Sequence, residues 1–265
     1  MSEQKETPAA TGHPVHFVGA GPGDAELITL KGRRLLDRAD LVIYTGSLVP
    51  RALLEGIAAE IHDSAGMTLD EVIDLIVARQ RQGARVVRLH TGDPSIYGAI
   101  AEQMARLRMH GITYAVVPGV SSGTAAAASL AAELTLPEVS QTVIITRRGG
   151  RTPVPPGESL ESLAAHQATM LIYLSVGMIE EVVAELRRGG YPSDTPAAIV
   201  EKASWPEEVR LRGNLATIAS QAREAGIAKT AIIAVGRVFA EEGPTALSKL
   251  YDGSFSHGYR KGEAG

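Results

Sequence analysis

Short apolar runs alternate with amphipathic segments along the first half of the chain. Runs of four or five residues, rich in Val and Ile as in buried strands, stand at 15–19, 41–44, 86–90, 114–117 and 142–146. Between them, helical spacing of apolar residues or an Ala-rich composition predicts helices at 29–38, 68–82, 98–110 and 118–132. This alternation predicts a mainly parallel sheet with helices on both faces.

The second half has a different pattern. Residues 147–159, RRGGRTPVPPGES, lack apolar periodicity and are rich in Arg, Gly and Pro, as expected of an interdomain linker. Beyond them we expect strands at 169–174, 197–200, 209–212 and 230–235 and helices at 178–188 and 215–224. The run VRLR at 209–212 alternates as in an antiparallel strand.

The predicted fold class is therefore α/β, with two α/β domains. A flexible tail at 1–14 precedes an N-terminal domain at 15–146 with a mainly parallel sheet. The linker at 147–159 leads to a C-terminal domain at 160–265 with a mixed sheet.

Composition excludes several classes of protein. The 265 residues contain no Cys, so disulfides, thiolate nucleophiles and Cys-ligated metals are excluded, and the seven His show no metal-binding spacing. A formal net charge of -4 gives no basic footprint for nucleic acid. No apolar run approaches ~18 residues, and the first 13 residues are polar. We expect a cytoplasmic protein without metal that binds neither nucleic acid nor membrane.

Gly-rich loops follow three of the predicted strands: GPGD at 21–24, GDPSIYG at 92–98 and PGVSS at 118–122. Ligands of open α/β sheets bind beyond the carboxyl ends of strands, although each loop alone could be a plain turn. A dinucleotide fingerprint would need Gly where Asp24 stands, and no P-loop occurs. The loops contain no Lys or Arg. The pattern favours an adenosine ligand without phosphates.

Together, the segments VHFVGAGPGDAELITLKG (15–32), LHTGDPSIYG (89–98), VPGVSS (117–122) and TRRGGRTPVP (146–155) strongly resemble the tetrapyrrole methylases. These are the class III S-adenosylmethionine-dependent methyltransferases. The loop TGSLVP at 45–50 and the ending LYDGSFSHGYR at 250–260 resemble the branch that methylates a precorrin in cobalamin biosynthesis. The resemblance covers residues 15–260.

The resemblance implies that S-adenosyl-L-methionine binds in a cleft between the two domains and leaves as S-adenosyl-L-homocysteine. It also implies a homodimer. The residues matching the family's cofactor positions are Pro22, Gly92, Asp93, Ile96, Ser121, Ser122, Tyr173, Leu174, Ala203 and Ile232. No catalytic residue is assigned; Asp63, in the sequence HDSAG, is a candidate base whose alternative role is turn formation.

A precorrin carries acetate and propionate groups that need cationic or hydroxyl partners. The candidates for these contacts are Arg51, Arg147, Arg148 and Arg151, and we expect Ser47, Tyr97 and Met104 to face the same substrate cavity. For each arginine, the alternative is an ordinary solvated charge.

Other functions remain open at this stage. The chain could methylate another precorrin position, a cobalt-containing precorrin, a modified-histidine precursor or ribosomal RNA, although its acidic charge disfavours RNA. It could also be a non-catalytic sensor of S-adenosylmethionine. The Arg-rich segment argues against a sensor, because a sensor has no anionic second ligand.

Overall fold

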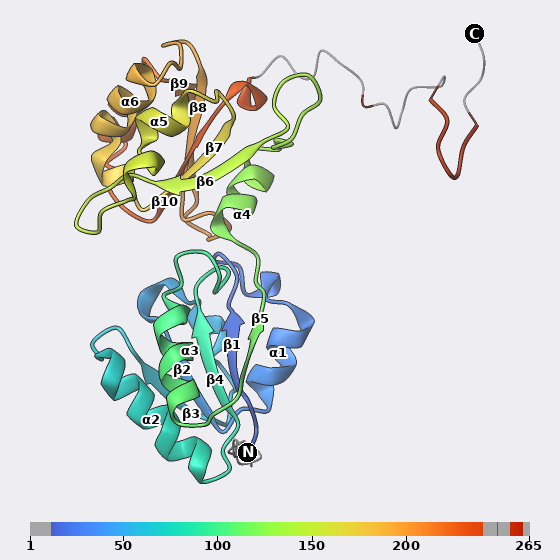
Figure 1. Ribbon diagram of the computed structural model, residues 1–265, viewed down its shortest axis with the longest axis vertical. Coiled ribbons are helices and arrows are strands. Elements are labelled where there is room, and N and C mark those ends of the chain that lie inside the picture. Colours follow the sequence, from blue (N-terminus) through green and yellow to red (C-terminus); the bar gives the residue numbers. More distant parts are fainter. Residues whose placement is uncertain (1–11, 241–247, 249–254, 262–265) are drawn as a thin grey trace, which may run out of the picture. The chain divides into compact units, whose positions relative to one another are not determined.

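The computed structural model describes residues 12–240, 248 and 255–261, which divide into two compact units. The first unit contains the described residues up to Ala125 together with Ser204–Pro206, and the second contains the rest. Figure 1 shows the elements of both. No helix among these described residues combines the length and apolar character needed to span a bilayer.

The first unit is built on a parallel sheet of five strands in the order β3-β2-β4-β1-β5. Its main elements are β1 (Val15–Gly19), α1 (Leu30–Asp37), β2 (Leu41–Tyr44), β3 (Glu60–Asp63), α2 (Leu69–Arg81), β4 (Val86–His90), α3 (Ile100–Met109) and β5 (Tyr114–Val117). The mainly parallel sheet expected for the N-terminal half is thus confirmed.

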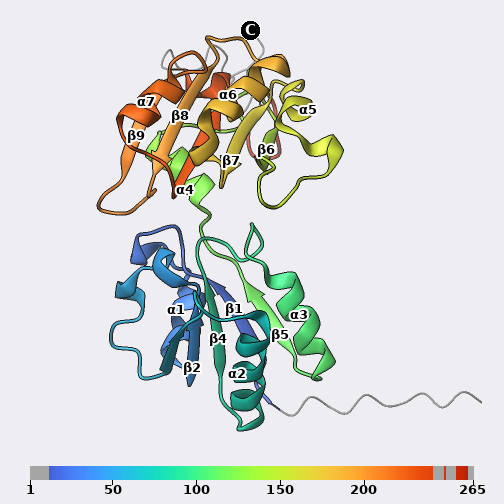
Figure 2. The same ribbon diagram turned by 90° about the vertical axis from the view of Figure 1, so that its left-hand side faces the viewer.

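Helices cover both faces of this sheet, as Figure 2 shows. Leu36 of α1 packs on one face with Val18 of β1, and Ile76 of α2 packs on the other with Phe17. Helix α3 contributes Leu107 to the second of these clusters. Strands β1 and β4 are neighbours, but the helices that follow them cover opposite faces. Such a switch point opens a crevice at the carboxyl edge of a parallel sheet.

The second unit contains a mixed sheet in the order β6-β7-β10-β8-β9. Helix α4 (Ser122–Ser129) includes Ala125 and Ala126, where the two units divide. The other elements are β6 (Val143–Arg147), α5 (Leu160–Ala164), β7 (Thr169–Tyr173), α6 (Ile179–Arg188), β8 (Pro196–Glu201), β9 (Val209–Asn214), α7 (Ile218–Glu224) and β10 (Ala231–Val235). Strands β6 and β7 are parallel, and the other pairs are antiparallel. Helices α5, α6 and α7 pack on one face of this sheet.

Two expectations from the sequence need correction. The strand predicted at 142–146 is β6, but it pairs with β7 in the second sheet, from Val143 opposite Thr169 to Arg147 opposite Tyr173. Residues 147–159 therefore connect β6 to α5 inside the second unit and do not link two domains. The second correction is β3, whose sequence EIHD contains one apolar residue and gave no strand pattern.

Candidate functional site

Three loops meet at the carboxyl edge of the first sheet, where β4, β1 and β5 lie side by side. The Ala20 N–H donates to the His90 carbonyl at 2.7 Å. Gly21 and Gly92 then exchange two backbone hydrogen bonds, with N···O distances of 2.8 and 3.3 Å. These bonds hold the GPGD loop after β1 against the GDPSIYG loop after β4.

Glycine is required at this edge by close backbone packing. A Cβ on Gly19 would lie 2.5 Å from the Gly92 carbonyl oxygen and 2.6 Å from the Gly119 Cα. A Cβ on Gly119 would lie 2.2 Å from the same oxygen. The obstructing atoms belong to the backbone, so no side-chain rotation relieves the clash. The edge is therefore a surface of closely packed backbone.

Asp93 connects two of these loops. Its Oδ2 accepts a hydrogen bond from the Gly119 N–H at 3.0 Å, and its Oδ1 accepts from the Ser95 N–H at 2.8 Å and from the Ser95 hydroxyl. Partial burial raises the pKa of Asp93, but these hydrogen bonds outweigh burial and leave the pKa below its usual value. A carboxylate is thus held ionised at the carboxyl edge of the first sheet.

The GDPSIYG loop ends in strained backbone. Tyr97 and Ala99 have φ values of 54° and 49°, which L-residues seldom adopt. A Cβ on Gly98, between them, would lie 2.1 Å from the Pro94 carbonyl oxygen. Such strain persists only where surrounding contacts enforce it, and it is concentrated at functional loops.

Trp205, the single tryptophan of the chain, packs against the GPGD loop within the first unit. Its indole Nε1 donates to the Pro22 carbonyl at 2.9 Å, and its ring fills the space that a Cβ on Gly23 would need, 2.1 Å away. The Asp24 N–H donates to the Ser204 hydroxyl at 3.0 Å. Sequence reasoning did not identify Trp205, which is 183 residues from Pro22 along the chain.

The structure brings together the six cofactor positions predicted in the first unit. Pro22 follows Gly21 in the loop after β1, while Gly92, Asp93 and Ile96 belong to the loop after β4. The Gly92 backbone faces Ser121 and Ser122, since a Cβ on Gly92 would lie 3.8 Å from the Ser121 Cα and from the Ser122 nitrogen.

The four cofactor positions predicted in the second unit also gather at one edge, on its sheet. Tyr173 ends β7, and Ile232 lies beside it near the start of antiparallel β10, where Ile233 pairs with Ile172. Both side chains are buried. Ala203 follows β8, and the preceding Lys202 N–H donates to the Thr230 carbonyl at the start of β10.

Leu174 stands out at this edge of the second sheet. It is 71% exposed and has a φ of 54°. Lys202 and Thr230, at the same edge, also have positive φ. Strained backbone is therefore a property of the loops that carry predicted positions in both units.

The predicted substrate positions are more scattered. Ser47 lies in the 3-10 turn η2 (Gly46–Leu48), and its side chain is outside the described part of the structure. Arg51 begins η3 (Arg51–Leu53) and is exposed, and Tyr97 is 45% exposed. Met104 of α3 packs against the hydrophobic core of the first unit, which accounts for an apolar residue there without a ligand.

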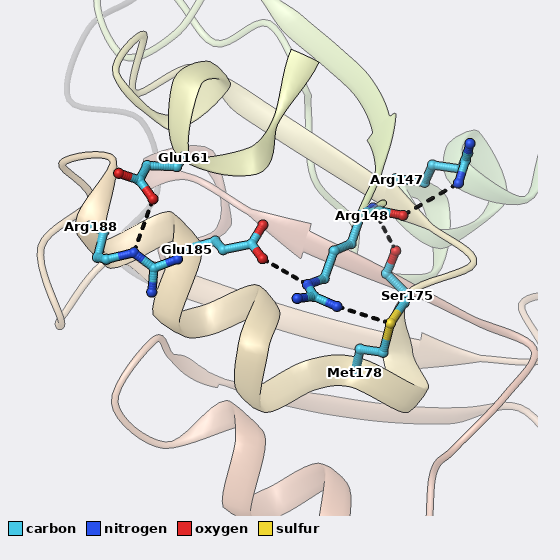
Figure 3. Close-up of polar contacts among 7 residues, drawn as sticks. All are labelled: Arg147, Arg148, Glu161, Ser175, Met178, Glu185 and Arg188. Atoms are coloured by element: carbon cyan, nitrogen blue, oxygen red, sulfur yellow. Dashed lines mark hydrogen bonds and ion pairs between the residues drawn. The ribbon is translucent and has the colours of Figure 1, made fainter. Parts of the chain in front are cut away.

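Two of the three arginines around 147–151 have structural partners (Figure 3). Arg147 donates to the Thr152 and Pro153 carbonyls, each at 2.9 Å, and so closes the loop after β6. Arg148 forms a half-buried ion pair with Glu185 at 2.8 Å. Arg151 is exposed, and within residues 12–240 the structure gives it no hydrogen bond or ion pair. Of these three arginines, Arg151 alone has no side-chain partner among the residues that the structure describes.

Asp63, predicted to lie in a loop, is the last residue of β3 and sits beside Tyr44 of β2. Its Oδ1 accepts a hydrogen bond from the Ala65 N–H at 2.8 Å, as in a turn. Burial, together with the charge and hydrogen bond of Asp63, raises the pKa of Tyr44, while Arg51 acts in the opposite direction. Asp63 therefore has the turn-forming contact that its alternative role predicts.

The first-unit edge has the character expected for an uncharged or cationic nucleoside ligand. Its loops offer backbone groups and small hydroxyls, contain no Lys or Arg and place the Asp93 carboxylate between the loops after β4 and β5. A polyphosphate would meet unopposed negative charge there, whereas a sulfonium would be favoured. Asp24 supports this interpretation. Its carboxylate caps the 3-10 turn η1 (Ala25–Leu27), so a negative charge already occupies the N-terminal end of the turn, where a phosphate would otherwise bind. Within the described residues, no His, Asp and Glu side chains cluster in a way that could hold a metal.

Comparison with known proteins gives the following relationships. The family model for tetrapyrrole (corrin/porphyrin) methylases matches residues 14–219. The cobalt-precorrin-4 C(11)-methyltransferase of Methanocaldococcus jannaschii is 57% identical over 93% of this chain and 96% of its own length. The precorrin-4 C(11)-methyltransferase of Pseudomonas aeruginosa is 48% identical over 94% of this chain and 99% of its own.

Solved structures agree with these relationships. The X-ray structure of a cobalt precorrin-4 methyltransferase, a cobalamin biosynthetic enzyme, superposes with a TM-score of 0.84 at 44% identity, covering 86% of this chain and 96% of that one. A uroporphyrin-III C-methyltransferase from Thermus thermophilus, solved in complex with S-adenyl homocysteine, has a TM-score of 0.72 at 30% identity, covering 85% of this chain and 98% of that one.

Proposed function

The chain belongs to the tetrapyrrole (corrin/porphyrin) methylases, and on that premise we propose that it methylates ring carbon 11 of precorrin-4 with S-adenosyl-L-methionine. The products are precorrin-5 and S-adenosyl-L-homocysteine, in the biosynthesis of cobalamin. The observation that carries this proposal is near full-length similarity, at 57% and 48% identity, to relatives named for this reaction.

Relatives of this chain are named for two forms of the substrate, with and without cobalt. The relative at 57% identity is named for cobalt-precorrin-4, and the relative at 48% identity for precorrin-4. We propose precorrin-4 as the substrate and keep cobalt-precorrin-4 as the alternative, because relatives named for each of the two match nearly the whole chain. The two substrates differ in whether the macrocycle holds cobalt.

The S-adenosyl ligand is proposed to bind at the carboxyl edge of the first sheet. Gly92 and Asp93 would face its methionine end, Pro22 and Ile96 would line it, and the PGVSS loop would contribute Ser121 and Ser122. Tyr173, Leu174, Ala203 and Ile232 would contribute from the second unit. The Gly21–Gly92 pair and the Asp93–Gly119 bond hold the three loops of the first unit together, which supports assigning the ligand to these loops.

The chemistry demands alignment more than acid–base catalysis. When bound, S-adenosyl-L-methionine supplies an electrophilic methyl group on a positively charged sulfur that departs as a neutral thioether. The acceptor carbon forms the new carbon–carbon bond, and a proton leaves elsewhere in the macrocycle. The chain's residues therefore need to hold both reactants in line and keep water out. The ionised carboxylate of Asp93 adds a charge complementary to the sulfonium.

The substrate's carboxylates are proposed to bind to cationic and hydroxyl groups. Arg151 and Arg51 are exposed and suited to this role, with Tyr97 and Ser47 as hydroxyl partners. The hydrogen bonds that Arg147 donates to Thr152 and Pro153 support a role in shaping the loop that carries Arg151.

The deciding experiment uses S-adenosyl-L-methionine with a 13C-labelled methyl group and precorrin-4, metal-free or cobalt-containing. A 13C methyl signal at carbon 11, with release of S-adenosyl-L-homocysteine, is expected. A label at another ring carbon would indicate a different precorrin methylase. Binding of S-adenosyl-L-methionine without turnover of either form would favour a sensor and contradict the proposal.

Two further parts of the proposal concern assembly and location. We propose a homodimer in the cytoplasm, on the basis of the family resemblance and the absence of Cys from the sequence. Analytical ultracentrifugation at several protein concentrations tests the first part, and a single monomeric species would overturn it. Fractionation of the source cells tests the second.

A further inference from the structure

Arg88 is a buried cation in the middle of β4, with 5% of its surface exposed. Its Nε donates to the Gln103 side-chain oxygen at 3.0 Å, and its Nη1 donates to the Ile43 carbonyl at 3.1 Å. Neither acceptor is charged. Burial lowers the pKa of Arg88 to about 10, opposed by the charge of Asp63, so the guanidinium stays protonated at neutral pH. Burying a charge without a bonded carboxylate is costly, and Val86, on the same face of the strand two residues earlier, packs in an apolar cluster.

Gln103 connects Arg88 to Ala99, the residue that directly follows the GDPSIYG loop. It lies on α3, is 6% exposed, and its Nε2 donates to the Ala99 carbonyl at 2.8 Å. The Arg88 guanidinium fixes the amide's orientation, because only the amide oxygen can accept from it and the amide nitrogen is left to donate to Ala99. Arg88 and Ala99 are thereby connected through one side chain.

Ala99 is the residue at which such an anchor is needed. It is the N-cap of α3, adopts φ 49° and ψ 42°, and makes no side-chain capping hydrogen bond. This conformation is strained for an L-residue and persists only where its surroundings impose it. The other end of the loop is anchored by the Gly21–Gly92 pair and by the Asp93–Gly119 bond. Ile96 and Tyr97 lie between the two anchors.

We propose that Arg88 and Gln103 are positioning residues that fix the carboxyl end of the Gly92–Ala99 loop and thereby set the affinity for the S-adenosyl ligand. They act through Ala99, and the inference rests on the proposed function for its ligand. The alternative is a purely structural role, in which Arg88 only joins β4 to β2 and α3 and has no effect on ligand binding. The two roles differ in whether the Gln103–Ala99 bond matters for binding.

Gln103→Glu separates the two roles. A glutamate at this position still accepts from Arg88 and supplies the missing countercharge, but it cannot donate to Ala99 and would place an oxygen against the carbonyl. We expect the thermal midpoint to stay at or above that of wild type. Hydrogen exchange in the peptide covering 91–99 of the ligand-free protein should be faster by roughly five- to tenfold, and the calorimetric Kd of S-adenosyl-L-homocysteine should rise by about the same factor.

Gln80→Glu is the matched control, because Gln80 is another buried glutamine of the first unit, on α2, and its amide contacts the His13 carbonyl. It should change neither loop exchange nor ligand affinity. If Gln103→Glu does not fold, the double variant Arg88→Met, Gln103→Met removes the buried charge together with its partner and still leaves Ala99 unanchored. The same two readouts then apply.

Each outcome decides a different point. Unchanged exchange in 91–99 would show that Ala99 needs no anchor and would overturn the proposal. Faster exchange with an unchanged Kd would also overturn it, leaving a purely structural role. If wild type itself binds no S-adenosyl-L-homocysteine, the proposed function fails, while the exchange data still decide whether the loop is anchored.

Discussion

Asp93 and Gly119 are joined by a hydrogen bond of 3.0 Å between the loop after β4 and the loop after β5. The family resemblance implied that Asp93 contacts the cofactor, and a plain turn was the alternative for its loop. The structure shows that both of its carboxylate oxygens already accept hydrogen bonds from the protein. Asp93 therefore holds the two loops together, and what it can offer a ligand is its negative charge.

Asp93→Ala should consequently weaken both the fold and ligand binding. Losing hydrogen bonds to a charged acceptor should lower the free energy of unfolding by about 1–3 kcal/mol, and the Kd of S-adenosyl-L-homocysteine should rise roughly tenfold or more. Denaturant unfolding and calorimetry measure the two effects. Asp74→Ala, at an exposed position of α2, is the control. Weaker binding with an unchanged unfolding free energy would show that Asp93 acts only by touching the ligand.

Gly119→Ala tests the close packing of the three loops. The added Cβ would lie 2.2 Å from the Gly92 carbonyl oxygen and 2.8 Å from the Gly19 Cα, so the loops after β1, β4 and β5 must separate. We expect a clear loss of thermal stability and no measurable binding of S-adenosyl-L-homocysteine. Gly66→Ala, where no atom lies within 4 Å of the new Cβ, should behave as wild type. A Gly119→Ala protein that binds normally would disprove the packing argument.

The fold was predictable where burial leaves a pattern in the sequence. The apolar runs at 41–44 and 114–117 coincide with β2 and β5. Strand β3 was not predicted, because its sequence EIHD is largely exposed at the sheet edge and its one apolar residue, Ile61, gives no periodic pattern. Strand β6 was recognised but assigned to the wrong sheet, because its pairing with β7 depends on residues far away in the sequence.

The candidate site was predictable from the Gly-rich loops and the family resemblance, which located Gly92 and Asp93 at a strand end. What the sequence did not predict were particular side-chain contacts, one between distant segments and one within a loop. The bond from Trp205 to Pro22 spans 183 positions, and the hydrogen bonds donated by Arg147 depend on how its loop folds back. No local pattern encodes either contact.

His90 predicts an acid-sensitive contribution to stability. It is 2% exposed, and its Nε2 has no hydrogen-bond partner among the described residues. Burial, and secondarily the charge of Arg88, lowers its pKa to about 3. Between about pH 6.5 and pH 3 the unfolded chain therefore binds a proton that the folded chain does not, so acid favours unfolding. The contribution is fully present above pH 6.5 and is lost at about 1.4 kcal/mol per pH unit below it.

His90→Leu should remove this pH dependence. Between pH 7 and pH 5, wild type should lose about 2 kcal/mol more unfolding free energy than the variant. Urea denaturation of both proteins at the two pH values measures the difference. Parallel stability curves for the two proteins would mean that His90 is protonated in the folded state.

The arginines at 147, 148 and 151 should differ in their effects, although they stand within five residues of one another. Arg147→Gln removes the bonds to the Thr152 and Pro153 carbonyls, and Arg148→Gln breaks a half-buried pair with Glu185. Both should lower the thermal midpoint. Arg151→Gln should leave the midpoint unchanged, because its side chain is exposed and has no partner within residues 12–240.

Arg151→Gln should instead act on the substrate. Loss of one charge-assisted contact to a carboxylate should raise the KM for precorrin-4 roughly five- to tenfold at low salt, and the difference should shrink as salt screens the wild-type contact. The Kd of S-adenosyl-L-homocysteine should stay within about twofold of wild type, a margin of ~0.4 kcal/mol. Arg188→Gln, which breaks an exposed pair with Glu161 in the same unit, is the control and should change neither constant. An equal loss for both ligands would place Arg151 in a shared structural role, and no loss for either would make it an ordinary solvated charge.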